Sequence, residues 1–202
     1  MDDKHTRRII LASTSPRRRE LIASLGLPYE FMPSHADEST PETWTPEDIV
    51  EKLSLRKAGA ILAEVQKLGR CGVIVGSDTI VVLDGKVLGK PRDEEDAFRM
   101  LNMLQGRRHQ VFTGVACLDA ETGRQLVKHR STYVTMKPLD KSAIRAYIRS
   151  GEPSDKAGAY GIQGLGAVLI DYIEGCYFNV VGLPVSLLSD MLSEFGMHVL
   201  AE

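Results

Sequence analysis

The sequence predicts an α/β fold built on a mixed β-sheet. Short apolar runs with strand character alternate along the chain with segments of helical periodicity, the pattern of α/β proteins. The dipeptide Asp84-Gly85 interrupts this alternation with a strong hairpin signal, so antiparallel pairs are expected beside parallel ones. With 202 residues, 43% of them hydrophobic, the chain can bury a sizeable core without disulfides.

The first part of the chain is predicted to begin with a strand and a capped helix. Ser15 is a favourable cap, Pro16 suits the first helical position, and Gly26 ends the helix. Thr45-Pro46 repeats this start signal before a longer helix. We therefore expect, in order, a strand at 8–12, a helix at 16–25, a strand at 29–33, a loop at 34–45 and a helix at 46–65.

The rest of the chain continues the alternation of strands and helices. Asp93 and Asp140 are predicted to start two helices, and several glycines make the segment 151–166 largely a loop. We expect strands at 73–83, 86–88, 109–118, 125–136, 167–173 and 177–181, and helices at 93–104, 140–150 and from Pro184 onward.

The composition excludes several classes of protein. A net charge of −2, from 25 basic and 27 acidic residues, argues against a dedicated nucleic-acid binder. The three cysteines, Cys71, Cys117 and Cys176, lack the short spacing of a zinc or redox motif and are expected to be reduced thiols. The five histidines show no metal-ligand spacing. Because no apolar run has the length of a signal-peptide core or a membrane span, we expect a cytoplasmic protein without a membrane partner.

The first candidate site is the segment Ser13-Thr14-Ser15-Pro16-Arg17-Arg18-Arg19. A strand ends there, a hydroxyl-rich turn follows, and a helix begins with three arginines. Free amides at a helix N-terminus favour an anion, and guanidinium groups match phosphate oxygens. The alternative is a capped helix with a solvated basic first turn. Basic residues at this end of the helix dipole are unfavourable without a ligand, which favours a function.

The second candidate is Asp78, in the middle of an apolar strand. Aspartate is a poor strand residue, and a buried carboxylate is costly without a partner, which a metal ion, a cation or an activated water would supply. The alternative is an aspartate at a bulge, bonded to backbone amides. Glu38, in an acidic loop that could simply be solvated, would complete an oxygen-rich site for Mg²⁺ or Mn²⁺ together with Asp78.

Two lysines and a glycine-rich block are weaker candidates. Lys57 and Lys90 could bind an anion, and Lys90 is held between a glycine and a proline, although surface lysines are common. In Asp155-Lys156-Ala157-Gly158-Ala159-Tyr160-Gly161-Ile162-Gln163-Gly164, glycines allow a close approach of the backbone to a ligand. Gln163 offers a donor and an acceptor suited to a base edge. The alternative is a connector without a function.

Four blocks together resemble a known family. LASTSPRRREL, GSDTIVVLDGKVLGKP, DKAGAYGIQG and NVVGLP are similar, in this order and spacing, to the signatures of the Maf family of nucleotide pyrophosphatases. The resemblance spans about residues 8–195. It implies a single domain over 1–202, related to the inosine triphosphatase-like architecture, with a central mixed sheet flanked by helices and two lobes around a deep cleft. It also implies a homodimer.

The family hydrolyses nucleoside triphosphates between the α- and β-phosphates with a divalent cation, Mg²⁺, Mn²⁺ or Co²⁺. The resemblance implies that Asp78 is the catalytic proton acceptor, with Glu38 joining it in positioning metal or water. The resemblance also implies a phosphate channel lined by Ser13, Arg17, Arg18, Lys57 and Lys90. Among these, Lys90 is implied to be a catalytic residue together with Asp78 and Glu38. Ser77 departs from the alanine that is more usual in the family, and little consequence is expected.

The resemblance also implies a substrate preference. At Arg17, Thr79 and Gln163 the chain is similar to the branch that prefers dTTP, UTP and modified pyrimidine nucleotides, with Thr79 and Gln163 bonding the base edge. Two alternatives remain at this point. One is a pyrophosphatase for 7-methyl-GTP or inosine triphosphate, and the other is a nucleotide-binding regulator of septum formation that needs no hydrolysis.

Overall fold

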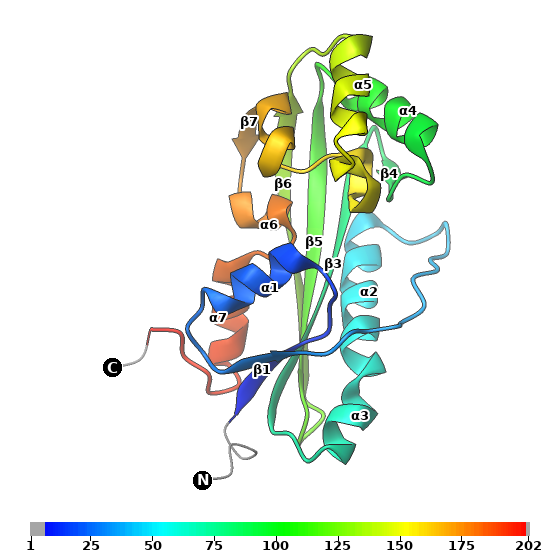
Figure 1. Ribbon diagram of the computed structural model, residues 1–202. Coiled ribbons are helices and arrows are strands. Elements are labelled where there is room, and N and C mark those ends of the chain that lie inside the picture. Colours follow the sequence, from blue (N-terminus) through cyan, green and yellow to red (C-terminus); the bar gives the residue numbers. More distant parts are fainter. Residues whose placement is uncertain (1–6, 201–202) are drawn as a thin grey trace. The chain divides into compact units, whose positions relative to one another are not determined.

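The computed structural model describes residues 7–200, and within that range seven strands form one mixed sheet (Figure 1). The strand order is β2-β1-β3-β5-β6-β7, and β4 pairs with β3. The strands are β1 (Arg8–Leu11), β2 (Tyr29–Phe31), β3 (Gly72–Leu83), β4 (Lys86–Leu88), β5 (Arg108–Asp119), β6 (Gln125–Met136) and β7 (Ile170–Glu174). β1 pairs in parallel with β2 and β3, whereas the β3–β4 and β6–β7 pairs are antiparallel. The predicted mixed α/β fold is confirmed.

The helices complete the element order. They are α1 (Pro16–Ala23), α2 (Pro46–Ala60), α3 (Leu62–Lys67), α4 (Glu94–Leu104), α5 (Lys141–Arg149), α6 (Tyr177–Val181) and α7 (Val185–Ser193). Three short 3-10 helices, η2 (Glu152–Asp155), η3 (Ala157–Ala159) and η4 (Gly164–Leu169), follow α5. Within residues 7–200, no helix is both long enough and apolar enough to cross a membrane.

The chain divides into two compact units. Unit 1 comprises Met1–Asp78, Thr113–Arg130 and Gly182–Glu202, and unit 2 comprises Thr79–Phe112 and Ser131–Val181. The long strands β3, β5 and β6 contribute residues to both units.

Unit 1 has three layers. Successive side chains of a strand point to opposite faces, so Ile9 and Leu11 of β1 share one apolar cluster while Ile10 and Ala12 share another. The first cluster includes residues of α1 and α7, and the second includes residues of α2 and the α2–α3 junction. Figure 1 shows α1 and α7 on one side of β1 and the long α2–α3 segment on the other. Both faces of this part of the sheet are therefore covered.

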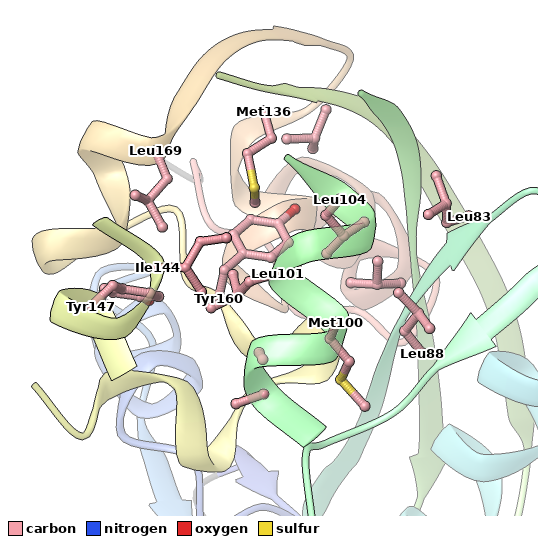
Figure 2. Packing of buried hydrophobic residues seen from close by; sticks show 14 of the residues in the cluster. Leu83, Leu88, Met100, Leu101, Leu104, Met136, Ile144, Tyr147, Tyr160 and Leu169 are labelled. Atoms are coloured by element: carbon pink, nitrogen blue, oxygen red, sulfur yellow. The ribbon is translucent and has the colours of Figure 1, made fainter. Parts of the chain in front are cut away.

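Unit 2 has its own core, between α4, α5 and the strands of that unit. Leu101 and Leu104 of α4 and Ile144 of α5 are buried in it with Tyr160, from the loop after η3. Figure 2 shows the Tyr160 ring among these three side chains. Leu101 and Leu104 thus lie on the buried face of α4, and a residue of the glycine-rich block belongs to the core.

Several local predictions are confirmed by the caps and the hairpin. Thr45 Oγ1 accepts a hydrogen bond from Asp48 N at 3.2 Å, at the start of α2. Asp93 and Asp140 cap α4 and α5 in the same way. Asp84 and Gly85 have φ values of 50° and 74°, as a tight hairpin turn requires.

Three predictions about elements are wrong. The segment 177–181 is helix α6 and not a strand, because buried Asn179 donates from Nδ2 to Val111 O at 2.9 Å and to Thr132 Oγ1 at 3.0 Å, and these tertiary contacts override the strand propensity. The predicted helix 46–65 is broken at Ile61 into α2 and α3, two residues after Gly59, a weak helix former. The strand predicted at 167–173 begins only at Ile170, because η4 precedes it.

Candidate active site

The centre of the candidate site in unit 1 is an ion pair between Asp78 and Lys57. Asp78 lies on β3 and is only 8% exposed. Lys57 Nζ, in the last turn of α2, donates to Asp78 Oδ1 at 2.6 Å. Sequence reasoning expected a metal ion, a cation or a water to offset the burial of this carboxylate, and the structure supplies a cation.

Two glycines bring α2 close enough to the sheet for this contact. A Cβ on Gly76 of β3 would lie 2.0 Å from Ser54 O, and a Cβ on Gly114 of β5 would lie 2.1 Å from Val50 O. At such distances a side chain at either position would force the helix or the strand to shift. The backbone of α2 therefore packs directly on β3 and β5. This close packing brings Lys57 within hydrogen-bond distance of Asp78.

Glu38 joins the same lysine from the loop before α2. Its Oε1 lies 2.8 Å from Lys57 Nζ, although the glutamate side chain is 55% exposed. The neighbouring loop is ordered by Ser39, whose N–H donates to Asp37 Oδ1 at 2.9 Å and whose carbonyl accepts from Arg56 at 2.7 Å. One ammonium group therefore holds two carboxylates, one buried and one open to solvent.

Arg18 is fixed beside this cluster by the backbone of Gly182. Its Nε donates to Gly182 O at 2.7 Å, and Ser77 Oγ donates to the same carbonyl at 3.0 Å. Burial lowers the pKa of the Arg18 guanidinium, and the charge of Arg17 adds to this, while the carboxylates of Asp78 and Glu38 oppose it. Arg18 is thus a partly desolvated cation in the field of the two acidic groups.

The remaining residues of the first candidate segment have different tasks. Ser13 is buried, and its Oγ accepts from Ser15 N at 3.1 Å, which shapes the turn between β1 and α1. Ser15 occupies the cap position, but its side chain makes no capping hydrogen bond, so that part of the prediction is wrong. Arg17 is half-buried. Arg19 lies over the Phe31 ring, with its guanidinium carbon 5.1 Å from the ring centroid.

Unit 2 contains the other three predicted residues. Thr79 follows Asp78 on β3 and is half-buried, Lys90 is exposed after β4, and Gln163 is half-buried before η4. Gly158 N donates to Gly89 O at 3.0 Å, so the segment of Lys90 is bound to the glycine-rich block that carries Gln163.

The donor set can be compared with the needs of a divalent cation. Mg²⁺ and Mn²⁺ favour carboxylate oxygens and are commonly held by one or two carboxylates together with waters and substrate phosphates. Asp78 and Glu38 converge on one cationic position, now taken by Lys57 Nζ, and so fit this requirement. Within residues 7–200, no group of three or more His, Cys, Asp or Glu side chains could hold a metal ion without such added ligands.

The structure also shows relevant residues that sequence reasoning missed. The carbonyl of Gly182 belongs to the NVVGLP block, but no residue of that block had been given a task. Tyr147 and Glu152 bind the backbone around Gln163. Neither has a sequence signal beyond its position just before a glycine-rich block. Of the histidines, His109 is buried beside Tyr160, and His5 lies outside the described residues.

Comparison with known proteins gives matches over nearly the whole chain. The family model described as "Maf-like protein" matches residues 8–195. A dTTP/UTP pyrophosphatase of Desulforamulus reducens is 50% identical over 194 residues, which cover 96% of this chain and 99% of the relative. Another, of Pelotomaculum thermopropionicum, is 49% identical over 192 residues, covering 95% and 98%.

A solved structure supports the fold. The Staphylococcus aureus Ham1 protein aligns with a TM-score of 0.50 and 15% identity, over 94% of this chain and 100% of that one. At this identity the likeness concerns the fold alone. The sequence matches support the family assignment. Because a family model covers residues 8–195 and relatives about 50% identical match over nearly their full length, the predicted resemblance is confirmed, and the chain belongs to the Maf family.

Proposed function

We propose that this protein hydrolyses dTTP and UTP, and modified uridine and cytidine triphosphates, to the monophosphate and pyrophosphate, and so removes unwanted nucleotides from the pool. The observation that carries the proposal is the buried Asp78 carboxylate held by Lys57 at 2.6 Å, beside the desolvated Arg18. This arrangement offers a fixed proton acceptor next to cations suited to phosphate oxygens. The relatives named dTTP/UTP pyrophosphatase support the choice of substrate.

In the proposed reaction, Asp78 orients a water molecule and accepts its proton. The water oxygen forms a bond with the α-phosphorus, and the bond from that phosphorus to the oxygen bridging to the β-phosphorus breaks. The electron pair leaves with pyrophosphate, and the nucleoside monophosphate remains. Lys57 keeps Asp78 in place before the reaction, through the contact that the structure shows.

The cationic groups stabilise the negative charge that develops on the departing pyrophosphate. We assign this task to Arg17, Arg18, Lys57 and Lys90, and we assign phosphate contact to the Ser13 hydroxyl. Arg18 is the best placed of these cations, because Gly182 O fixes its Nε beside Asp78 and Glu38. Its desolvation strengthens its attraction for an anion.

We further propose that Asp78 and Glu38 hold a divalent cation, Mg²⁺, Mn²⁺ or Co²⁺, when the nucleotide binds. Such an ion neutralises triphosphate charge and polarises phosphoryl oxygens. The two carboxylates already converge on Lys57 Nζ, which supports their cooperation with one cation.

For the base, we propose that Thr79 and Gln163 hydrogen-bond the pyrimidine edge, in line with the family resemblance at these positions. Sites that hydrogen-bond a substrate reject analogues that leave their polar groups unpaired. We also propose one functional domain over 1–202, a homodimer, and a cytoplasmic location. A cytoplasmic location fits the free thiols of Cys71, Cys117 and Cys176.

The test is pyrophosphate release from a panel of nucleoside triphosphates with Mg²⁺ or Mn²⁺, comparing wild type with Asp78→Asn. We expect release from dTTP and UTP, reduced by about 10²–10⁴-fold in the variant, while nucleotide binding persists. Asp171→Asn, at an exposed carboxylate on β7, is the control and should match wild type.

The outcomes separate the alternatives. Turnover confined to 7-methyl-GTP or inosine triphosphate would keep the enzyme class and overturn the assigned base contacts. Binding without any release of pyrophosphate would indicate a regulator. Unchanged turnover in a folded Asp78→Asn variant would remove Asp78 from the mechanism.

A further inference from the structure

The loop before Gln163 in unit 2 is anchored by Tyr147. This tyrosine lies on α5 and is 6% exposed. Its hydroxyl accepts a hydrogen bond from Gly161 N at 3.1 Å. A Cβ on Gly166 would lie 2.7 Å from that hydroxyl and 2.1 Å from Gly161 O, so the loop folds tightly against it.

The loop after Gln163 is anchored by Glu152. Its Oε1 accepts from Leu165 N at 2.8 Å, and its Oε2 accepts from Gly166 N at 3.1 Å. Desolvation opposes ionisation, but these amides, with help from the Tyr147 hydroxyl, leave the pKa of Glu152 lowered. Since an ionised carboxylate only accepts, the Tyr147 hydroxyl donates to it, and the two anchors form one network.

A third contact fixes the base of this loop. Tyr160 precedes Gly161, is 5% exposed, and places its hydroxyl 2.7 Å from His109 Nε2. Figure 2 shows Tyr160 within the unit 2 core. The loop therefore leaves a rigid core position before it reaches Tyr147 and Glu152.

Gln163 lies between the two anchors. Its backbone is extended, with φ −108° and ψ 170°, and its side chain makes no capping hydrogen bond with η4. Tyr147 binds Gly161, two residues before Gln163, and Glu152 binds Leu165, two residues after it. The anchors thus fix the backbone of Gln163 without using its side-chain amide for a cap.

We infer that Tyr147 and Glu152 are positioning residues for recognition of the pyrimidine base, acting through Gln163. The inference rests on the proposed function, because it takes Gln163 as a base contact. Hydrogen-bond selectivity depends on donors and acceptors held within a fraction of an ångström. Loosening the loop should therefore weaken base discrimination more than the chemical step, whose proposed residues Asp78 and Lys57 belong to unit 1.

The experiment measures kcat and KM for dTTP, UTP, CTP and GTP in wild type, Tyr147→Phe and Glu152→Gln. We expect KM for dTTP and UTP to rise about 5- to 10-fold, with the ratio of kcat/KM between UTP and GTP falling by a similar factor. The value of kcat should stay within about twofold, because the transition-state contacts remain. A general loss of structure would instead lower activity on all nucleotides alike.

Matched controls and a double variant complete the test. Tyr172→Phe and Glu95→Gln alter exposed residues of unit 2 and should leave the UTP/GTP ratio unchanged. Gln163→Ala should lower that ratio, and adding Glu152→Gln to it should lower it no further, because both act at one site.

The inference is overturned if folded Tyr147→Phe and Glu152→Gln retain the wild-type ratio and KM. It is also overturned if Gln163→Ala retains the ratio, and in that case dTTP and UTP hydrolysis by wild type still upholds the proposed function. Failure of wild type to release pyrophosphate from any nucleotide would overturn both.

Discussion

Unit 1 and unit 2 hold their candidate residues by different means. In unit 1, Asp78 and Lys57 sit on a strand and a helix and are joined by opposite charges at 2.6 Å. In unit 2, Gln163 lies on an irregular loop, held through hydrogen bonds to the backbone on both sides of it. Charges on regular elements suit the proposed triphosphate contacts, which need strong attraction. A loop held by directional bonds suits the proposed base contact, which needs selectivity.

This contrast predicts that charge removal in unit 1 has the largest effect on catalysis. Lys57→Met leaves Asp78 without its cation and removes a proposed phosphate contact, so kcat/KM should fall about 10²–10³-fold. Lys57→Arg, which keeps the charge, should retain part of the activity. Lys52→Met is the control, because Lys52 pairs at 2.8 Å with Asp48 on the exposed side of α2. Near-normal turnover in Lys57→Met would show that unit 1 does not depend on this pair.

The second prediction concerns the close packing that supports the pair. Gly76→Ala should reduce the free energy of unfolding by about 3 kcal/mol, because the new Cβ overlaps Ser54 O. Gly59→Ala, on α2 with open space around its Cβ, should instead raise it by about 0.5–1 kcal/mol. Urea denaturation measures both. Equal effects of the two variants would show that the helix can move off the sheet freely.

The smallest predicted effect is a dependence of the free energy of unfolding on pH, caused by His109 in unit 2. Burial lowers the pKa of His109 from 6.5 to about 4, although a backbone hydrogen bond opposes this. The unfolded chain therefore binds the proton first, so stability is complete above the unfolded pKa and declines as the pH falls towards about 4. From about pH 7 to about pH 5 the loss should be about 2 kcal/mol.

Comparison with His109→Gln isolates that contribution. The variant keeps a polar group facing Tyr160 but cannot take up a proton in this range. Its free energy of unfolding, measured by urea denaturation at both pH values, should change less with pH than that of wild type. Parallel pH profiles would mean that the pKa of His109 is the same in the folded and the unfolded protein.

The sequence predicted the candidate residues of unit 1 better than the residues that matter in unit 2. Asp78 was recognisable because an aspartate in an apolar strand needs a partner, and Lys57 followed from the family resemblance. Their contact depends on Gly76 and Gly114, which allow the approach of α2, and no periodic pattern reveals such a tertiary fit. Tyr147 could not be recognised at all, because a tyrosine on the inner face of a helix is normally only a core residue.

The two wrong predictions in unit 2 share one physical cause, a tertiary contact that the local sequence does not reveal. The segment 177–181 has the β-branched and aromatic residues of a strand, yet the contacts of Asn179 make it helical. The strand predicted from 167 starts late, because Glu152 binds two amides at the start of η4. In both places a single polar side chain, distant in sequence from its partner, decides the local structure.

The carbonyl of Gly182 affects the order in which parts of the molecule can fold during synthesis. It holds Arg18, yet a ribosome adds it 164 residues later, and α7, which shares a core with β1, follows it. All of unit 2 precedes this residue in the chain. During synthesis, unit 2 can therefore fold before Gly182 and α7, the partners of α1 and β1, have been made. A chain stopped at Val181 would carry every side chain that we propose for catalysis and still lack the carbonyl that holds Arg18.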